Sequence, residues 1–324
     1  MSADLSTRIS HLRSLLPTLE SAIQSFVSET SRRGKPGFRL LQTIKPSQSE
    51  EEKQSLRTLY ILDSSFNPPS LAHRALCLDA LRNSPSQTGL KRLLLLFSTH
   101  NADKSADAKT FIHRVATMIL FAEDLSTSLP PPEGQISIDV ALTSSPYYTD
   151  KTRAIESLHT DESEDPYPSK PTHVHLVGYD TFTRVLDPKY YSSFSPPLSA
   201  LRGYFGAGHR FRVALRPADQ ADPSSSEWGT EEDQRKRIEG LAVDEELGSK
   251  GWDKTWGQKI EIAGDGNGDK WVKAGKGVSS TRIRNAAGEG RWDEVKELCT
   301  EGAAAWIKEM GVYSTSGEKR EGNL

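Results

Sequence analysis

The feature that most restricts the fold of this chain is a regular alternation between short apolar runs and segments with helical spacing. The apolar runs cover residues 59–62, 93–97, 136–142, 174–177, 211–215 and 259–262. Segments with helical spacing follow most of them, at 70–81, from 110 onward, at 149–158 and at 180–186. Continuous apolar runs are typical of parallel strands covered on both faces. The alternation therefore predicts an α/β fold, a doubly wound parallel sheet that binds ligands at the carboxyl ends of its strands.

The two ends of the chain add helices to this pattern. Apolar residues at helical spacing predict a helix over 5–27, and Thr110 is the predicted N-cap of the helix that carries Ile112 and Val115. The remaining assignments are a short strand or an ordered connection at 38–44, a loose polar segment at 47–53, helices at 280–287 and 292–310, and a disordered tail at 314–324. We divide the chain into an N-terminal helix and linker (1–54), one main domain (55–313) and that tail.

Residues 219–256 interrupt the strand–helix pattern. This segment holds eleven acidic and five basic residues, a local charge of −6. We interpret it as an acidic surface insertion with some helix around 231–246, and not as a second domain. A strongly charged surface of this kind is a candidate docking site for a protein partner.

Charge and cysteine content exclude several classes of protein. The chain has 41 basic and 44 acidic residues, a net charge of −3, which offers no basic surface for nucleic acid. Two cysteines are too few for a disulfide framework or a thiolate metal site and indicate a reducing compartment. No apolar run approaches the roughly 18 residues of a membrane span. We expect no membrane association and a cytosolic location; a nuclear one remains an alternative, and the oligomeric state is left open.

The first candidate site is the segment Ser64-Ser65-Phe66-Asn67-Pro68-Pro69-Ser70-Leu71-Ala72-His73, which directly follows the first strand. A helix is expected to begin there, and its free N–H groups favour an anion. Ser70 and His73 are three residues apart, so both side chains project from one face of the first helical turn.

The second candidate site is Val278-Ser279-Ser280-Thr281-Arg282-Ile283-Arg284. Three hydroxyl side chains and a helix start precede Arg284, whose guanidinium can bind a phosphate through two parallel hydrogen bonds. The two segments lie at opposite ends of the α/β pattern, and both are suited to phosphate groups. Together they predict a nucleotide site.

In that order, the two segments resemble the G-x-F-x-P-x-[HT]-x-x-H and I-S-S-T-x-x-R motifs of the nucleotidyltransferase superfamily. From about residue 59 to 287 the chain is most similar to nicotinamide mononucleotide adenylyltransferases of a divergent eukaryotic type. The resemblance implies a Rossmann-like nucleotidyltransferase fold. It also implies an enzyme that joins nicotinamide or nicotinate mononucleotide to AMP from ATP with Mg²⁺, giving NAD and pyrophosphate.

The resemblance also implies roles for individual residues. His73, Lys104 and Arg284 would be catalytic, supplying charge to the phosphates in the transition state. Substrate and nucleotide would be bound by Ser65, Phe66, Ser70, Thr149, Thr152, Gly178, Asp180, Arg216, Ser279, Ser280 and Thr281. Asp180 could instead simply cap the helix that follows it, since Asp is a good N-cap.

Three positions depart from the family pattern. Ser64 stands where the family has glycine, Ser70 where it has His or Thr, and Arg282 where it commonly has Lys. The first of these changes bears on how closely the backbone can approach a ligand. None of them removes a charged group that the chemistry needs.

Two other functions are carried as alternatives. One is an ATP-binding or ATP-hydrolysing regulatory protein on the same fold, with the acidic insertion as its partner surface; deletion of residues 222–253 would then spare catalysis. The other is a nucleotidyltransferase that acts on a different phosphate acceptor. We predict no protein-bound metal, because His173 and His175 have no carboxylate or cysteine at ligand spacing.

Overall fold

The computed structural model describes residues 3–34, 37–44, 50–83, 89–99, 108–129, 136–156, 165–216, 227–264, 275 and 277–314. Its strands are β1 (Phe38–Ile44), β2 (Leu56–Ser64), β3 (Leu90–Ser98), β4 (Ile138–Thr143), β5 (Thr172–Gly178), β6 (Arg210–Ala214) and β7 (Ile260–Ile262). Its α-helices are α1 (Ala3–Arg33), α2 (Glu50–Ser55), α3 (Leu71–Asn83), α4 (Ala108–Ser128), α5 (Tyr148–Glu156), α6 (Tyr179–Val185), α7 (Arg202–Gly206), α8 (Glu231–Gly240), α9 (Glu245–Ser249), α11 (Ser280–Gly288), α12 (Trp292–Leu298) and α13 (Glu301–Glu309). Short 3₁₀ helices are η2 (Pro188–Tyr191), η3 (Pro197–Leu201) and η5 (Lys254–Lys259).

The seven strands form one sheet in the order β1-β4-β3-β2-β5-β6-β7. Strands β2 to β7 are parallel, which confirms the predicted doubly wound sheet. Strand β1 differs: it pairs antiparallel with β4 at the edge, so residues 38–44 are a strand and not a connection. The strand order reverses between β2 and β5. In open α/β sheets this is where ligands bind, beyond the carboxyl ends of the strands.

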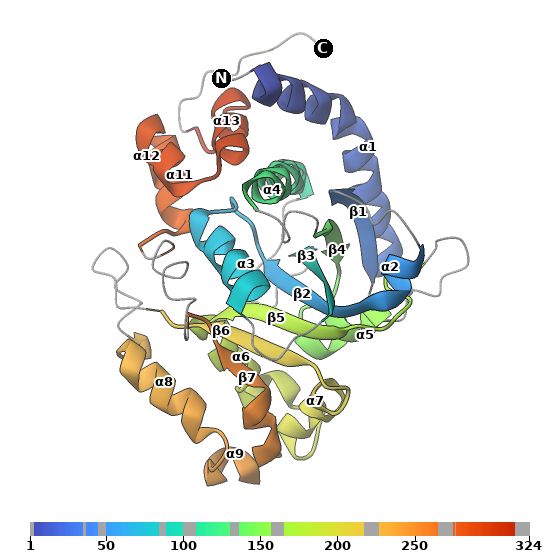
Figure 1. The fold of residues 1–324 in the computed structure, drawn as a ribbon, viewed down its shortest axis with the longest axis vertical. Coiled ribbons are helices and arrows are strands. Elements are labelled where there is room, and N and C mark those ends of the chain that lie inside the picture. The colour runs from blue at the N-terminus through green and yellow to red at the C-terminus, as the bar shows by residue number, and fades with distance from the viewer. Residues whose placement is uncertain are drawn as a thin grey trace.

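Helices cover both faces of the sheet (Figure 1). On one face, α1, α3, α4 and α13 pack on side chains from the central strands, including Tyr60, Leu95 and Val140. On the other face, α5 packs on β2 and β3, while α6, α7 and α8 pack on β6 and β7. None of the helices that the structure describes has both the length and the apolar character that a membrane span requires.

Helix boundaries differ from the predictions at three places. Helix α4 begins at Ala108, so Thr110 lies inside it and is not its N-cap, and α2 occupies 50–55, within a segment predicted to be loose. The predicted helix 292–310 is broken into α12 and α13. There Thr300 is extended (φ −72°, ψ 158°), and the N–H of Gly302 donates to Asp124 of α4 (2.8 Å). A tertiary contact thus starts a new helix where periodicity alone predicts one continuous helix.

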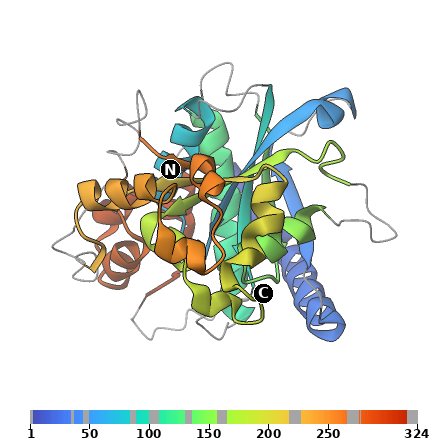
Figure 2. The ribbon, with the colours of Figure 1, turned by 90° about the horizontal axis from the view of Figure 1, so that it is seen from below.

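The acidic segment is helical, as predicted, but it is also part of the core. Its described part holds α8, α9 and the start of η5, and its buried apolar side chains are Ile238, Leu241, Leu247, Trp252 and Trp256. These pack with Phe205 and Phe211 in the cluster beside β6 and β7. Seen from below, the gold and orange helices of this segment lie in front of the sheet (Figure 2). The segment therefore completes one helical layer instead of projecting from it.

A buried ion-pair cluster joins α3 to β6 and β7. Nε of Arg212 donates to Asp79 (2.7 Å), and Nη1 of Arg212 donates to Glu261 (2.9 Å). Arg212 is 2% exposed and Asp79 is fully buried. Buried charges are tolerated when they are paired and hydrogen-bonded, and both conditions hold here. The cluster fixes α3, which carries His73, against the strand that leads to Arg216.

Candidate active site

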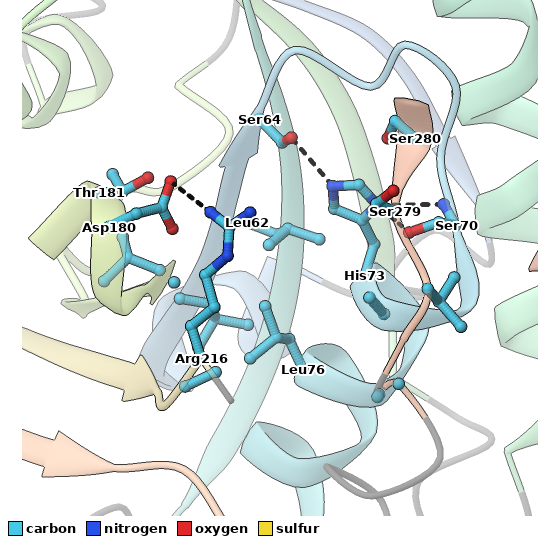
Figure 3. Close-up of a pocket in the computed structure, with 18 of the residues that line it drawn as sticks. Leu62, Ser64, Ser70, His73, Leu76, Asp180, Thr181, Arg216, Ser279 and Ser280 are labelled. Atoms are coloured by element: carbon cyan, nitrogen blue, oxygen red, sulfur yellow. Dashed lines mark hydrogen bonds and ion pairs between the residues drawn. The ribbon is translucent and has the colours of Figure 1, made fainter. Parts of the chain in front are cut away.

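A cavity of about 490 Å³ opens at the point where the strand order reverses. The ends of β2, β5 and β6 form its floor, the start of α3 forms one wall, and residues 277–280 close it from the other side (Figure 3). Of the predicted site residues, it brings together Ser70, His73, Gly178, Asp180, Arg216, Ser279 and Ser280. These come from four parts of the chain, so the cavity unites the two motifs identified in the sequence.

The turn between β2 and α3 is tightly constrained. Phe66 adopts a left-handed backbone conformation (φ 42°), which is uncommon for a residue other than glycine, and its side chain is fully buried. The Phe66 ring packs on His73, with ring centroids 5.3 Å apart. The Asn67–Pro68 peptide bond is cis. Ser65 is exposed at the start of this turn. Phe66 therefore supports the imidazole from beneath.

Hydrogen bonds define the protonation state of His73. The backbone N–H of Ser70 donates to Nδ1 of His73 (3.0 Å), and the Ser70 hydroxyl lies 2.9 Å from the same atom. Since Nδ1 accepts, the neutral ring carries its proton on Nε2, which donates to the hydroxyl of Ser64 (2.9 Å; Figure 3). Burial lowers the pKa of His73 to about 4. The imidazole is therefore neutral at pH 7 and presents one N–H donor; the catalytic role of His73 stays a prediction.

The second motif lies against the first. Ser279 is the N-cap of α11, and its hydroxyl accepts from the backbone N–H of Arg282 (3.2 Å). The Ser280 hydroxyl donates to the carbonyl of Pro68 (2.8 Å), and Nη1 of Arg284 donates to the carbonyl of Asn67 (2.7 Å). Helices α3 and α11 therefore begin side by side, and both N-termini face the cavity.

Arg284 and Thr281 lie beside the cavity and not among its lining residues. Nη2 of Arg284 donates to the hydroxyl of Thr281 (3.0 Å), and the rest of the guanidinium faces the turn at Asn67. In this arrangement Arg284 holds the two motifs together. To bind a phosphate through Nη1, the guanidinium would have to leave the carbonyl of Asn67.

At the opposite side of the cavity, Asp180 faces Arg216 (Figure 3). The carboxylate and Nη1 of Arg216 are 3.6 Å apart. Gly178 is the N-cap of α6, so Asp180 does not cap this helix. A Cβ at Gly178 would lie 2.8 Å from Oδ1 of Asp180, so a larger residue there would displace this carboxylate. The Asp180 carboxylate is thus held at the cavity wall.

A buried ion pair that the sequence did not predict lies next to the cavity. Lys151 of α5 donates to Asp63, the penultimate residue of β2, and both side chains are 6% exposed. Asp63 lines the cavity. Its position directly before the first motif, and that of Lys151 between the predicted site residues Thr149 and Thr152, were the available signals. The pair anchors α5 beside the cavity.

Besides Thr281 and Arg284, four predicted site residues are not among those that line the cavity: Ser65, Phe66, Thr149 and Thr152. Thr152 is 3% exposed within α5. Lys104 lies outside the described residues.

A second cluster of polar groups lies elsewhere, where ligand atoms of Glu156, His173 and His209 are within 4.8 Å of one another. Nδ1 of His209 accepts from the backbone N–H of His173 (3.0 Å), so its Nε2 carries the proton and donates to Glu156 (3.0 Å). The two imidazoles are stacked, with centroids 4.5 Å apart and planes 18° apart. The nitrogen lone pairs of the two imidazoles lie in the planes of their rings. Because these planes are nearly parallel, the lone pairs do not point to one common ion. We therefore assign no metal to this cluster.

Comparisons with known proteins agree with the motifs. No protein-family model matches the chain. A curated protein of Schizosaccharomyces pombe, named "Putative nicotinamide mononucleotide adenylyltransferase", is 29% identical over 265 residues, which cover 82% of this chain and 89% of that protein.

Among solved structures, a nicotinic acid mononucleotide adenylyltransferase of Plasmodium falciparum complexed with NaAD aligns with 79% of this chain and 97% of its own, at 13% identity and a TM-score of 0.45. A Plasmodium falciparum complex with APC aligns over the same shares at 13% identity and a TM-score of 0.44. Over four fifths of its length the chain is therefore similar to a protein named as a nicotinamide mononucleotide adenylyltransferase, and its two motifs occur in the order that resembles that family.

Proposed function

We propose that this protein is an adenylyltransferase that joins nicotinamide or nicotinate mononucleotide to the AMP portion of MgATP, with release of pyrophosphate. The phosphate oxygen of the mononucleotide attacks the α-phosphorus of ATP in line, and the bond from that phosphorus to the bridging oxygen of pyrophosphate breaks. The observation that carries the proposal is the single cavity in which His73, Ser279 and the N-termini of α3 and α11 meet Asp180 and Arg216.

These groups suit a reaction that needs positioning and charge stabilisation without a covalent intermediate. The N–H groups at the two helix starts and Nε2–H of His73 are donors for the phosphate oxygens. The Asp180 carboxylate can accept hydrogen bonds from ribose hydroxyls, for which it is held by Arg216. An anionic phosphate beside His73 would raise the pKa of the imidazole from its low value.

Mg²⁺ belongs to the substrate in this proposal. The two carboxylates that line the cavity, Asp63 and Asp180, each face a cationic side chain, Lys151 and Arg216. Mg²⁺ usually binds substrate phosphates, keeps several waters and takes only one or two protein carboxylates. We therefore expect the ion to enter with the triphosphate.

The test follows NAD and pyrophosphate together when the purified protein is incubated with MgATP and nicotinamide mononucleotide. Equal amounts of both products, dependent on the mononucleotide, are expected. A parallel reaction with nicotinate mononucleotide decides between the two substrates. Phosphate release from ATP without the mononucleotide, and no NAD, would replace this proposal with the regulatory ATP-hydrolysing alternative. Pyrophosphate formed only with another phosphate acceptor would assign the chain to a different nucleotidyltransferase activity.

A substitution of Ser64 tests the role of His73, and we expect it to strengthen the binding of MgATP. The Ser64 hydroxyl accepts the Nε2–H of His73, the donor that a phosphate would use. The variant Ser64→Ala removes this competing acceptor. A neutral hydrogen bond contributes about 0.5–1.5 kcal/mol, so the dissociation constant for MgATP should fall about twofold to tenfold. Isothermal titration calorimetry measures this change.

A matched control is Ser14→Ala on α1, where the exposed hydroxyl donates to the carbonyl of His11. It should leave the dissociation constant for MgATP unchanged. Weaker ATP binding by Ser64→Ala would show that the hydroxyl itself contacts the nucleotide or orients the imidazole. In that case it would not act as a competing acceptor.

A further inference from the structure

Gln234 of α8 links the acidic segment to the candidate active site. The backbone N–H of Arg216 donates to Oε1 of Gln234 (2.8 Å), and Nε2 of Gln234 donates to the carbonyl of Arg216 (2.7 Å). Gln234 is fully buried, and Nε2 also reaches the carbonyl of Gly229 (3.4 Å). The amide thus satisfies both backbone groups of Arg216, as a neighbouring strand would.

Arg216 lies two residues beyond the end of β6. The strand pairing of β6 ends at Val213 on the side of β7 and at Ala214 on the side of β5, before residue 216. Its side chain nevertheless lines the cavity, where the guanidinium faces Asp180 at 3.6 Å. Gln234 therefore holds the backbone of Arg216 from behind, while the side chain extends into the cavity (Figure 3).

Helix α8 is itself firmly placed. Thr230 and Asp233 form a capping box at its start, with the N–H of Asp233 donating to the Thr230 hydroxyl (3.1 Å) and the N–H of Thr230 donating to Asp233 (2.9 Å). Ile238 is buried in the cluster that contains Trp252 and Trp256. A buried amide on a helix fixed at both ends is a rigid support for the residue that it contacts.

We propose that Gln234 is a positioning residue for nucleotide binding, through which the acidic segment holds Arg216 in the orientation that engages ATP. The inference rests on the proposed function only in assigning this cavity to a nucleotide. It reverses the expectation drawn from sequence, since deletion of residues 222–253 would remove Gln234 and weaken nucleotide binding.

The experiment measures the dissociation constant for MgATP by isothermal titration calorimetry, with the full chain and without the second substrate. Gln234→Leu removes both hydrogen bonds at nearly constant volume, and the constant should rise roughly tenfold or more, as expected for loss of an ordered charged contact. Gln234→Glu fills the same space and keeps an acceptor for the Arg216 N–H, but it loses the donor to the carbonyl. Gln234→Glu should raise the dissociation constant less than Gln234→Leu does. It replaces Gln234→Leu in the experiment if that variant does not fold.

A double-mutant cycle separates positioning from a general structural effect. If Gln234 acts through Arg216, adding Gln234→Leu (or Gln234→Glu) to Arg216→Ala should cause no further loss of affinity. Lys236→Ala is the matched control on α8, because this exposed side chain pairs only with Glu232 among the contacts described for it. It should leave the constant unchanged. Fully additive losses in the cycle, or wild-type affinity of both Gln234 variants, would overturn the proposal.

The readout also separates this inference from the proposed function. A wild-type chain that binds MgATP but forms no NAD with either mononucleotide would contradict the proposed function, while the cycle would still decide the role of Gln234. A wild-type chain that does not bind MgATP would overturn both.

Discussion

The variant His73→Ala is expected to reduce turnover by about two to three orders of magnitude while the protein remains folded. Loss of one preorganised donor to a developing phosphate charge costs roughly 2.7–4 kcal/mol of transition-state stabilisation. His73 is half-buried and faces the cavity, so its removal leaves no apolar core position empty. The measurement is the initial rate of NAD and pyrophosphate formation, with circular dichroism and a thermal unfolding curve to verify the fold.

The control for this variant is His11→Ala, at an exposed position on α1, which should have wild-type activity. The combination of Nε2–H donation and a pKa near 4 leads to a further expectation. Between pH 6 and 8 the free enzyme should show no step in kcat/KM for ATP that is due to His73, because the imidazole is already neutral. Wild-type turnover of His73→Ala would exclude His73 as a donor to the reacting phosphates.

The second large effect is on stability. We expect Asp79→Ala to lower the free energy of unfolding by roughly 3–5 kcal/mol, the range for breaking a buried pair and leaving one charge uncompensated. Asp79 accepts from Nε of Arg212 (2.7 Å) and from the backbone N–H of Gly264 (3.3 Å). Its loss would leave the Arg212 guanidinium, 2% exposed, with Glu261 as its remaining carboxylate partner among those described. Urea-induced unfolding measures the change.

Two further variants make this stability prediction specific. Glu232→Ala breaks the exposed pair with Lys236 and should change the free energy of unfolding by at most about 1 kcal/mol. Asp79→Asn keeps an acceptor oxygen for Arg212 and should cost less than Asp79→Ala. A midpoint for Asp79→Ala equal to that of the wild type would show that the pair contributes nothing to stability beyond its own desolvation. Since the cluster ties α3 to β6, a destabilised variant should also bind MgATP more weakly.

Local patterns in the sequence predicted the elements of the sheet well. Apolar runs at 93–97 and 174–177 lie inside the observed strands 90–98 and 172–178, because a strand covered on both faces must be apolar along its whole length. The two motifs were visible for a similar reason: a helix start that binds phosphate requires particular small and hydroxyl residues in order. The patterns failed where a tertiary contact determines the local structure, as at the break between α12 and α13.

The sequence does not predict the protonation states of the site residues or their hydrogen-bond partners. Nothing local to Ser64 indicates that its hydroxyl meets Nε2 of His73, nine residues away, because that contact depends on the turn built around Phe66. Burial then lowers the pKa of His73, and burial is a property of the assembled cavity. A sequence shows which titratable residues exist, while the field around each comes from groups distant in the chain.

The sequence by itself determined the α/β class, the strand–helix order and the two motifs that we predict to bind phosphate, because each depends on residues close together in the chain. Only the tertiary structure decided which of those residues meet in one cavity and what holds them there. The contacts Asp79–Arg212 and Gln234–Arg216 make this plain: neither partner predicts the other by spacing or periodicity. Packing of the acidic segment onto β6 and β7 turned an apparent surface insertion into the support of Arg216, since a buried amide must find hydrogen-bond partners wherever the fold places it.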